Sequence, residues 1–472
     1  MAMACRASAP VARRRTRAWP VRSALTSVER FAARRRHCGE MKQLVCLLPL
    51  AVAGCGASPH AATAGGAAAD RWLLTGARIY VAPDAPPLDN AWVVVTAGKI
   101  EAVGAAPVAP PAGVRRQEAC SGGVITAGFQ NSHVHFAHPA FNAAATQPRG
   151  QLQPPITEMT TRFGFTTVVD TGSLLPNTVA LRQRIARGDV QGPAILTAGI
   201  PIYPEHGIPF YLRDMPPELL AQMPQPATVE DAIGVVRRNL GNGANGTKLF
   251  VATPQGHGEI RRMAPEIARA AAAETHKLGG LVMAHPTDPD GVKLAVESGV
   301  DIVVHTTIDP DGSAWSAELI HDLVARHVSV VPTLQLWGYE LAKAKLPAGV
   351  RDGIVALAER QLLAFSRAGG QVLFGTDVGY MTDFDPTREY ALMAHAGLTP
   401  MQILASLTTA PAARWHAADR RGVLKPGFDA DLVVLDGDPA ADVTRFTAVK
   451  CTIRAGKELY VRGATAASAS GQ

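Results

Sequence analysis

Metal-binding side chains end several short apolar runs of this chain, and this pattern limits its fold more than any other feature. The runs are rich in Val, Leu, Ile and Phe, and they end in His133-x-His135, Lys248, His285, His305 and Asp377. In an extended strand, residues i and i+2 point to the same face, so His133 and His135 can bind one metal ion together. A (β/α)8 barrel gathers its functional side chains at the C-terminal ends of its strands. The pattern therefore predicts such a barrel.

The regions between these runs support a parallel α/β fold. Strand-like and helix-like segments alternate between residues 124 and 417, which is typical of parallel α/β proteins. Helices are expected near residues 228–240, 259–278, 314–327 and 350–368. We expect the eight barrel strands to end near His135, Asp170, Tyr203, Phe250, His285, His305, Gln335 and Asp377.

Both ends of the candidate barrel are flanked by β-rich runs. These runs cover residues 71–81 and 91–103 on the N-terminal side, and 427–435 and 449–461 on the C-terminal side. Short strands with open edges need partners. The runs from the two ends of the chain are therefore expected to pair with each other.

The first seventy residues differ in composition from the rest. Residues 1–40 carry ten Arg and two acidic residues, and residues 41–54 have the charged start, short apolar core and small-residue end of a secretory signal. Val52-Ala-Gly-Cys55 resembles the bacterial lipoprotein box, which predicts lipidation of Cys55. We expect Met41 to be the true start and 1–40 to be upstream sequence translated in error; an arginine-rich arm on a protein made from Met1 is the alternative. Residues 55–70 are expected to form a flexible tether.

Charge argues against a nucleic-acid partner. The chain has a net charge of +6, but removing the +8 of residues 1–40 and the +1 of Lys42 leaves −3 for residues 55–472. No basic surface is then expected to bind nucleic acid. The predicted localisation is exported, on the periplasmic or cell-surface side of a bacterial membrane, held only by the lipid on Cys55.

Two cysteines remain besides Cys55 in the exported chain. Cys120 and Cys451 both fall in the β-rich flanks, and an exported protein permits a disulfide. Pairing cannot be read from spacing, so two buried thiols are an equally acceptable interpretation.

The ordered set of ligand types resembles the amidohydrolase superfamily. Segments 398–413 and 422–434 resemble the C-terminal signature of that family. The resemblance implies a barrel over 124–417 and a discontinuous β-sandwich from 71–123 and 418–463. It also implies two divalent metal ions, for which zinc is expected: His133, His135 and Asp377 would hold one ion, His285 and His305 the second, and carboxylated Lys248 would bridge them.

The resemblance further implies hydrolysis of amide bonds in a small molecule, as in dipeptidases or N-acyl-amino-acid hydrolases. A hydroxide shared by the metals would attack the carbonyl, with Asp377 as general base and acid and His206 as a donor to the oxyanion. Two positions depart from the family pattern: Pro204-Glu205 precede His206, and Asn131 stands where an Asp is typical. A plain loop histidine is the other interpretation of His206.

Two alternatives remain open. A single-metal deaminase of the same superfamily typically carries a Glu shortly after the histidine of the fifth strand, whereas residues 286–290 contain none. The other alternative is a non-catalytic binding lipoprotein. Such relatives usually lack some of the ligands, and this chain has all six. The oligomeric state stays undetermined.

Overall fold

The computed structural model describes residues 71–307, 312 and 314–464. The predicted upstream segment 1–40, signal peptide 41–54 with its lipidation site, and tether 55–70 all lie outside the described residues. Within the described ranges, no helix is long and apolar enough to cross a membrane.

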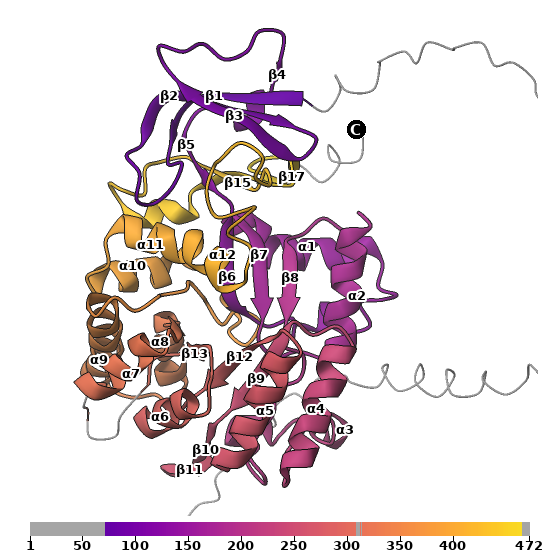
Figure 1. Ribbon diagram of the computed structural model, residues 1–472, viewed down its shortest axis with the longest axis vertical. Helices are drawn as coiled ribbons and strands as arrows, with labels where there is room; N and C mark the ends of the chain where they lie inside the picture. Colours follow the sequence, from indigo (N-terminus) through magenta and orange to yellow (C-terminus); the bar gives the residue numbers. More distant parts are fainter. Residues whose placement is uncertain (1–70, 308–311, 313, 465–472) are drawn as a thin grey trace, which may run out of the picture. The chain divides into compact units, whose positions relative to one another are not determined.

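Strands from both ends of the chain pair in one sheet, the β-sandwich that the sequence predicts (Figure 1). β5 joins the two halves, because it pairs with both β1 and β15. Apolar side chains such as Trp72, Leu432 and Ile453 form a core of its own for this sheet. The N-terminal strands are β1 (Arg71–Ile79), β2 (Leu88–Thr96), β3 (Lys99–Ala105), β4 (Arg115–Arg116) and β5 (Val124–Ala127), and the C-terminal strands are β15 (Leu432–Leu435), β16 (Val449–Arg454) and β17 (Lys457–Val461).

Two of the predicted β-rich runs are hairpins rather than single strands. The run 91–103 contains most of β2 and β3, which turn at Ala97 and Gly98 with φ of 48° and 76°. The run 449–461 turns in the same way at Ala455 and Gly456. Positive φ at both central residues is the geometry of a tight two-residue hairpin turn.

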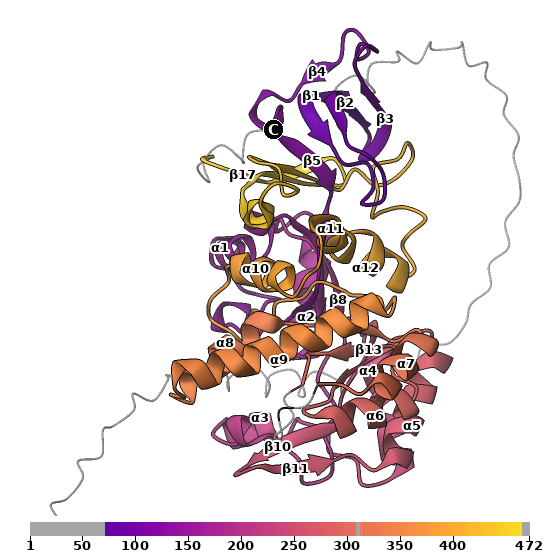
Figure 2. The same cartoon turned by 90° about the vertical axis from the view of Figure 1, so that its left-hand side faces the viewer.

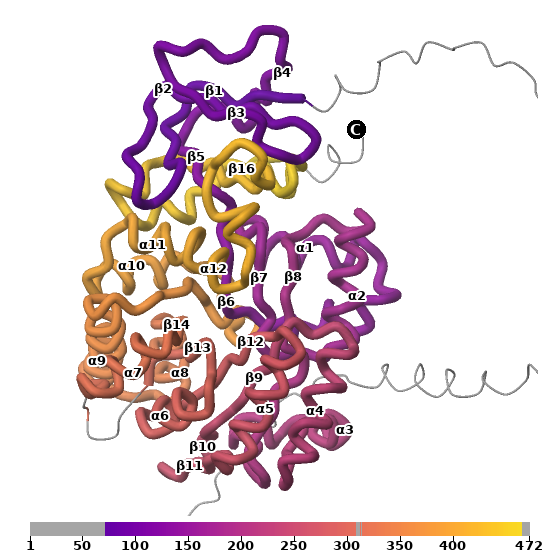
Figure 3. Tube along the Cα trace, in the orientation of Figure 1, coloured from indigo at the N-terminus to yellow at the C-terminus, as the bar shows by residue number. Residues whose placement is uncertain are grey.

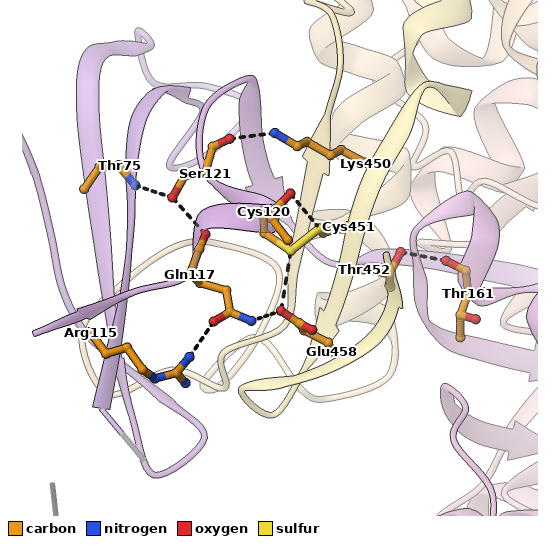
Figure 4. Close-up of a disulfide and its surroundings, with 11 residues drawn as sticks. Thr75, Arg115, Gln117, Cys120, Ser121, Thr161, Lys450, Cys451, Thr452 and Glu458 are labelled. Carbon is orange, nitrogen blue, oxygen red and sulfur yellow. Dashed lines mark hydrogen bonds between the residues drawn. A yellow bond between two sulfur atoms is a disulfide. The ribbon is translucent and has the colours of Figure 1, made fainter. Parts of the chain in front are cut away.

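A disulfide joins Cys120 to Cys451, one of the two alternatives that the sequence allows. Cys120 ends the short helix η2 (Glu118–Cys120), and Cys451 lies on β16. Beside it, Gln117 donates a hydrogen bond to Glu458, and Lys450 Nζ donates to the Ser121 carbonyl at 2.7 Å (Figure 4). The disulfide thus fastens segments 331 residues apart in the sequence.

The barrel is built from two parallel sheets and one further segment. The first sheet contains β6 (Phe129–Val134), β7 (Phe165–Asp170) and β8 (Ala194–Thr197); the second contains β9 (Gly246–Phe250), β12 (Leu281–His285), β13 (Ile302–Val304) and β14 (Ser329–Val331). Figure 3 shows β13 beside β14, with which it pairs in parallel.

Backbone hydrogen bonds close these sheets into a barrel. On one side, Ile202 N donates to Lys248 O at 2.9 Å, so the chain after β8 continues the first sheet into β9. On the other side, residues 371–374 act as the eighth strand: Leu373 N donates to Val330 O at 2.9 Å, and Ser132 N donates to Phe374 O at 2.7 Å. The predicted (β/α)8 architecture is confirmed.

The core of the barrel has two parts. Apolar side chains, including Val169, Met283, Val304 and Leu373, form a smaller cluster within the barrel, and a larger cluster packs the strands against the helices outside them. The longest described helix, α9, packs against α7, α8 and α10 (Figure 2). The helices are α1 (Arg149–Met159), α2 (Leu175–Ala186), α3 (Pro217–Leu220), α4 (Val229–Gly241), α5 (Pro265–Lys277), α6 (Pro289–Glu297), α7 (Ala317–Ala325), α8 (Leu334–Lys343), α9 (Ala348–Arg367), α10 (Thr387–His395), α11 (Pro400–Leu407) and α12 (Thr409–Arg414).

Three details differ from the sequence-based expectation. The expected helix 259–278 begins only at Pro265, because 259–262 form β11 (Glu259–Arg262), a hairpin with β10 (Ala252–Gly256). The seventh strand ends at Val331, and Gln335 already lies in α8.

The third difference concerns the start of the barrel. Residues 124–127, which the sequence assigned to the barrel, belong to the sandwich sheet. Gly128 lies between β5 and β6, where the backbone passes so close to β7 that a Cβ would lie 2.3 Å from Thr166 Oγ1. Only glycine fits this approach to the neighbouring strand.

Candidate metal centre

The six predicted ligands lie at one end of the barrel and line one cavity of about 990 Å³. His133 lies near the end of β6, Lys248 lies on β9 and His285 ends β12. His135 follows β6, His305 follows β13, and Asp377 follows residues 371–374, the eighth strand of the barrel. The strand ends therefore bring together side chains that are up to 244 residues apart in sequence.

Three ligand atoms from the first predicted metal site converge. His133 Nε2 lies 3.1 Å and His135 Nε2 lies 2.9 Å from Asp377 Oδ1, and the two imidazole nitrogens are 3.2 Å apart. His133 and Asp377 are buried, with exposed side-chain fractions of 1% and 6%. The chain thus places two nitrogens and one carboxylate oxygen around a common point.

The second predicted pair continues the same cluster. The ring centroids of His285 and His305 are 4.9 Å apart, and those of His305 and His133 are 4.8 Å apart. One ligand atom from each of His133, His305 and Asp377 can be chosen so that all three lie within 4.8 Å of one another. His305 therefore connects the two predicted sites.

Hydrogen bonds on the far side of two imidazoles set their tautomers. His135 Nδ1 lies 2.8 Å from the Gly172 carbonyl, which can only accept. His305 Nδ1 lies 2.6 Å from Thr333 Oγ1, which donates its own proton to the Pro332 carbonyl at 2.9 Å. Each Nδ1 must then carry the proton, which leaves each Nε2 lone pair free for a metal ion.

The electrostatics of the cluster give three neutral imidazoles, those of His133, His285 and His305, and an ionised carboxylate. Burial lowers the pKa of His133 and of His285 to about 3, and it lowers the pKa of His305 well below its ordinary value. Burial alone would raise the pKa of Asp377, but His133 and His135 outweigh it and hold this pKa well below the ordinary value. These are the protonation states that a divalent metal requires.

The pKa values of His135 and Lys248 shift in opposite directions. Burial would lower the pKa of His135, but its close contact with the Asp377 carboxylate and the negative charge of that group outweigh burial and raise this pKa. Burial lowers the pKa of the Lys248 amine to about 7, although Asp377 acts in the opposite direction. A share of Lys248 is therefore a neutral amine at physiological pH.

Unsatisfied buried atoms indicate that the cluster suits a metal ion. His133 Nδ1 and Asp377 Oδ1 are both buried, and neither makes a hydrogen bond of acceptable geometry. The short contacts of Asp377 Oδ1 to the imidazoles are thus close approaches rather than aligned hydrogen bonds. A buried polar atom without a partner costs about 1–3 kcal/mol, and a metal ion would remove that cost for the carboxylate oxygen.

Strained backbone marks the same strand ends. His305, Thr333 and Asp377 have φ of 76°, 43° and 62°, in the left-handed region that side chains other than glycine rarely adopt. Such strain costs roughly 1–3 kcal/mol per residue and is concentrated at functional sites.

Asp170, at the end of β7, holds the loop that orients His135. Its fully buried carboxylate accepts hydrogen bonds from Gly172 N and from the hydroxyls of Ser173, Thr178 and Thr197, at 2.6–3.2 Å. The Gly172 carbonyl in turn accepts from His135. The sequence marked Asp170 only as a strand end; the signal that it could do more was a single charged residue at the end of an uncharged, β-branched run.

Asn131, which departs from the family pattern, also supports the first ligands. Its side chain is buried, and Oδ1 accepts from His133 N at 3.1 Å while Nδ2 donates to Thr376 Oγ1 at 2.8 Å. Asn131 thus ties the His133 backbone to the residue before Asp377.

The structure does not bring His206 to this cluster. Its side chain is 84% exposed, lies 3.7 Å from Glu205 and does not line the cavity. The nearby residues that do face the cavity are Tyr203, Phe210 and Tyr211, which follow β8 or lie in the short helix η5 (Phe210–Leu212). The sequence could not show which of these loop residues face the cavity, because the direction of a side chain in a loop follows no periodic pattern.

Comparison with known proteins extends this picture. A model of the amidohydrolase family matches residues 124–459. Ochratoxinase from Aspergillus niger is 25% identical over 235 residues, which are 46% of this chain and 46% of that protein, so the match spans about half the length of this curated relative.

Solved structures show the same fold. A Xaa-Pro dipeptidase with methionine bound in its active site has a TM-score of 0.70 and 20% identity, over 82% of this chain and 99% of that one. Ochratoxinase from A. niger has a TM-score of 0.68 and 19% identity, over 84% of this chain and 97% of that one. At these identities the two likenesses concern the fold, whereas the family match covers most of the sequence. The chain belongs to the amidohydrolase family, as its strand-end residues predicted.

Proposed function

We propose that the protein is a metal-dependent hydrolase of carbon–nitrogen bonds in small amides. The observation that carries this proposal is the convergence of His133, His135 and Asp377 in a buried site at the strand ends of the barrel. Membership of the amidohydrolase family supports the reaction class. Dipeptides and N-acyl amino acids are the substrate classes that the sequence resemblance implies.

The metal-binding roles are assigned from the sequence order and the protonation states. His133, His135 and Asp377 would hold one divalent ion, and His285 and His305 would hold a second; we expect zinc for both. These ions would supply the Lewis acidity that activates water and polarises the scissile carbonyl. Asp377 would take a proton from the attacking water and pass it to the leaving nitrogen, which departs poorly without it.

Lys248 would act as a bridging ligand after carboxylation. Its neutral amine nitrogen attacks the carbon of carbon dioxide, a new N–C bond forms, and the amine proton leaves to water, which gives an anionic carbamate. Support comes from its burial, with 2% of the residue exposed, and from the lowering of its pKa to about 7. An unmodified ammonium would be a poor neighbour for metal ions.

The reaction is tested with a panel of dipeptides, N-acyl amino acids and neutral amides. We expect hydrolysis that disappears after dialysis against a chelator and returns with zinc. Asp377→Asn should lower kcat by at least about a thousandfold, because it removes both a metal ligand and the proton carrier. A matched control is Asp189→Asn, because Asp189 lies on the surface away from the cavity. Activity that persists without metal or in Asp377→Asn would contradict the proposal.

A single-metal centre is a second candidate, since His133, His305 and Asp377 alone form a compact trio of ligand atoms. A deaminase with one metal ion would release ammonia from its substrate. Ammonia release, together with one metal ion per chain, would favour it over amide hydrolysis.

We also propose that the protein is exported and anchored to a bacterial membrane by lipid on Cys55. The disulfide between Cys120 and Cys451 supports an oxidising compartment. Expression of the full chain in bacteria should place the protein in the membrane fraction, and Cys55→Ser should release it. Equal recovery of both forms from the cytoplasm would contradict this localisation.

A further inference from the structure

The cavity wall beyond the metal ligands is unusually aromatic. Rings from several different elements of the barrel face it, and long flexible apolar side chains complete the wall. Phe210 stands at this wall with 51% of its surface exposed, so apolar surface continues to solvent. The aromatic residues on the wall are Phe136, Tyr203, Phe210, Tyr211, Phe250, Trp337 and Tyr380.

Charges on this wall are negative. Among the described residues that line the cavity, Lys248 is the only lysine or arginine, and it belongs to the candidate metal centre. Glu259 and Glu340 are the acidic residues there besides Asp377. A carboxylate on the substrate would therefore meet no guanidinium or ammonium on the wall outside the centre.

Glu340 of α8 presents its charge toward the cavity. Its Oε1 accepts from Tyr380 Oη at 3.0 Å and from Lys343 Nζ at 2.9 Å. Lys343 itself does not line the cavity; its Nζ lies 4.0 Å from the centroid of the Tyr339 ring. Lys343 and Glu340 form a partly exposed ion pair, and no described residue donates to Oε2 of Glu340, so the charge of this carboxylate is offset only in part and still disfavours an anion nearby.

Two tyrosines connect Glu340 with the metal centre. The rings of Tyr211 and Tyr380 are 5.8 Å apart, and both line the cavity. Burial raises the pKa of Tyr211 well above its ordinary value, and Tyr380, Asp377 and Glu340 add to this increase. Tyr211 thus lies within the field of both carboxylates, and its ring offers a face for stacking between them.

From this wall we propose that the substrate is an amide that carries a bulky aromatic group and no free carboxylate on the part that fills the cavity. The inference rests on the proposed amide hydrolysis and narrows its substrate: dipeptides and N-acyl amino acids carry a carboxylate that this wall repels, whereas an aromatic ring gains apolar contacts. Glu340 is the residue that sets this preference.

The test uses three ligands of nearly equal shape: N-phenylbenzamide and its two para-carboxylated derivatives, one substituted on the acyl ring and one on the aniline ring. Their binding to the zinc-loaded holoenzyme is measured by calorimetry, and released amine is measured in the same samples. We expect N-phenylbenzamide to bind at least tenfold more tightly than either acid. Glu340→Gln should reduce this ratio to about threefold or less, while Glu318→Gln on the exposed face of α7 should leave it unchanged.

Binding and turnover separate the inference from the function on which it rests. Tighter binding of N-phenylbenzamide without amine release would support the cavity preference and contradict amide hydrolysis. Equal or tighter binding of both acids, a ratio unchanged in Glu340→Gln, or failure of N-phenylbenzamide to bind would each overturn the inference.

Discussion

At the scale of single residues, the geometry of the candidate metal centre depends on side chains outside the set of candidate ligands as much as on that set itself. Asp170 is the clearest case, because one buried carboxylate fixes four donors, and the loop thus held supplies the carbonyl that orients His135. Most of the candidate ligands could be placed at strand ends from the sequence, because they end an apolar run. The role of Asp170 could not be predicted, because its partners Thr178 and Thr197 reach it only in the folded chain.

Replacing Asp170 with Ala should therefore weaken both stability and metal binding. Four donors, of which Thr178 and Thr197 are fully buried, would lose their acceptor, which should cost about 2–4 kcal/mol of unfolding free energy. Zinc affinity should fall about 10–100-fold, as is typical when the partner of a metal-binding histidine is disturbed. Urea unfolding and competition with a zinc chelator measure the two effects. The control Asp189→Ala removes a half-exposed surface carboxylate and should change the unfolding free energy and the zinc affinity only slightly. If Asp189→Ala lowered both as much as Asp170→Ala, the role assigned to Asp170 would be wrong.

Acid should destabilise the metal-free protein through its buried histidines. In the folded protein the pKa of His133 and of His285 is about 3 and that of His305 is also low, whereas the ordinary value is 6.5. Below pH 6.5 the unfolded chain therefore binds more protons than the folded chain, and unfolding becomes more favourable. Glu389, whose buried carboxyl has a pKa raised to about 7, acts in the opposite direction and offsets one histidine.

Three histidines less one carboxyl leave two net protons, so the loss of stability steepens below pH 6.5 and reaches about 3 kcal/mol per pH unit near pH 5, at roughly 1.4 kcal/mol per proton and pH unit. Urea unfolding of chelator-treated protein across this range measures it. A stability that is constant from pH 6.5 to 4.5 would show that these histidines are not buried and neutral.

At the scale of elements, the position of α8 matters most for the site. Glu389 of α10 accepts hydrogen bonds from Leu334 N at 2.9 Å and Gln335 N at 2.7 Å, and so caps the start of α8. This cap fixes the preceding Thr333, whose hydroxyl orients His305. The sequence extended the seventh strand to Gln335 because the apolar run continues past Val331, whereas the helix is fixed by a carboxylate 54 residues further on.

Thr333→Val should show what the hydroxyl of Thr333 contributes, because valine has nearly the same shape but cannot form the hydrogen bond to His305. The change leaves the Nδ1–H group of His305 buried without a partner, which should cost about 1–3 kcal/mol and lower zinc affinity about tenfold or more. Thr333→Ser keeps the hydroxyl and should retain affinity within about threefold. Calorimetric zinc titration compares the two variants, and equal losses in both would assign the effect to packing rather than to the hydrogen bond.

Other elements show why strand ends were predictable and loops were not. The strand β12 is an apolar run that ends in His285, and in β9 the single charged residue, Lys248, stands among uncharged residues, so both patterns can be read from the sequence alone. The hairpin of β10 and β11 was wrongly assigned in part to a helix, because Glu259–Arg262 gains its strand structure only by pairing with Ala252–Gly256. The side chains of that hairpin and of η5 shape the cavity, so the part of the site that selects the substrate was the least predictable.

At the scale of the whole molecule, the two ends of the chain hold each other in place. The sandwich sheet needs strands from both ends, and the Cys120–Cys451 disulfide links them covalently across 331 residues. The resemblance to a family predicted this discontinuous domain. The disulfide could not be predicted, because two cysteines allow pairing but do not require it.

Reduction of this disulfide should lower the stability of the protein by about 2–5 kcal/mol, the usual range for a native crosslink. Urea unfolding with and without a thiol reductant measures the change. A variant with both Cys120→Ser and Cys451→Ser should have the same unfolding free energy as the reduced protein, and the reductant should not change it. An unaltered unfolding curve after complete reduction would show that hydrogen bonds between the strands suffice.

The central claim is that six residues from the strand ends form one metal centre, with Lys248 as a bridge. Elemental analysis of the protein expressed from Cys55 onward, beside its Lys248→Ala variant, tests it most directly. The account predicts close to two metal ions per chain, and a clear decrease in the variant. One ion per chain that is unaffected by Lys248→Ala would contradict the bridged centre, and no bound metal would contradict the metal-dependent function altogether.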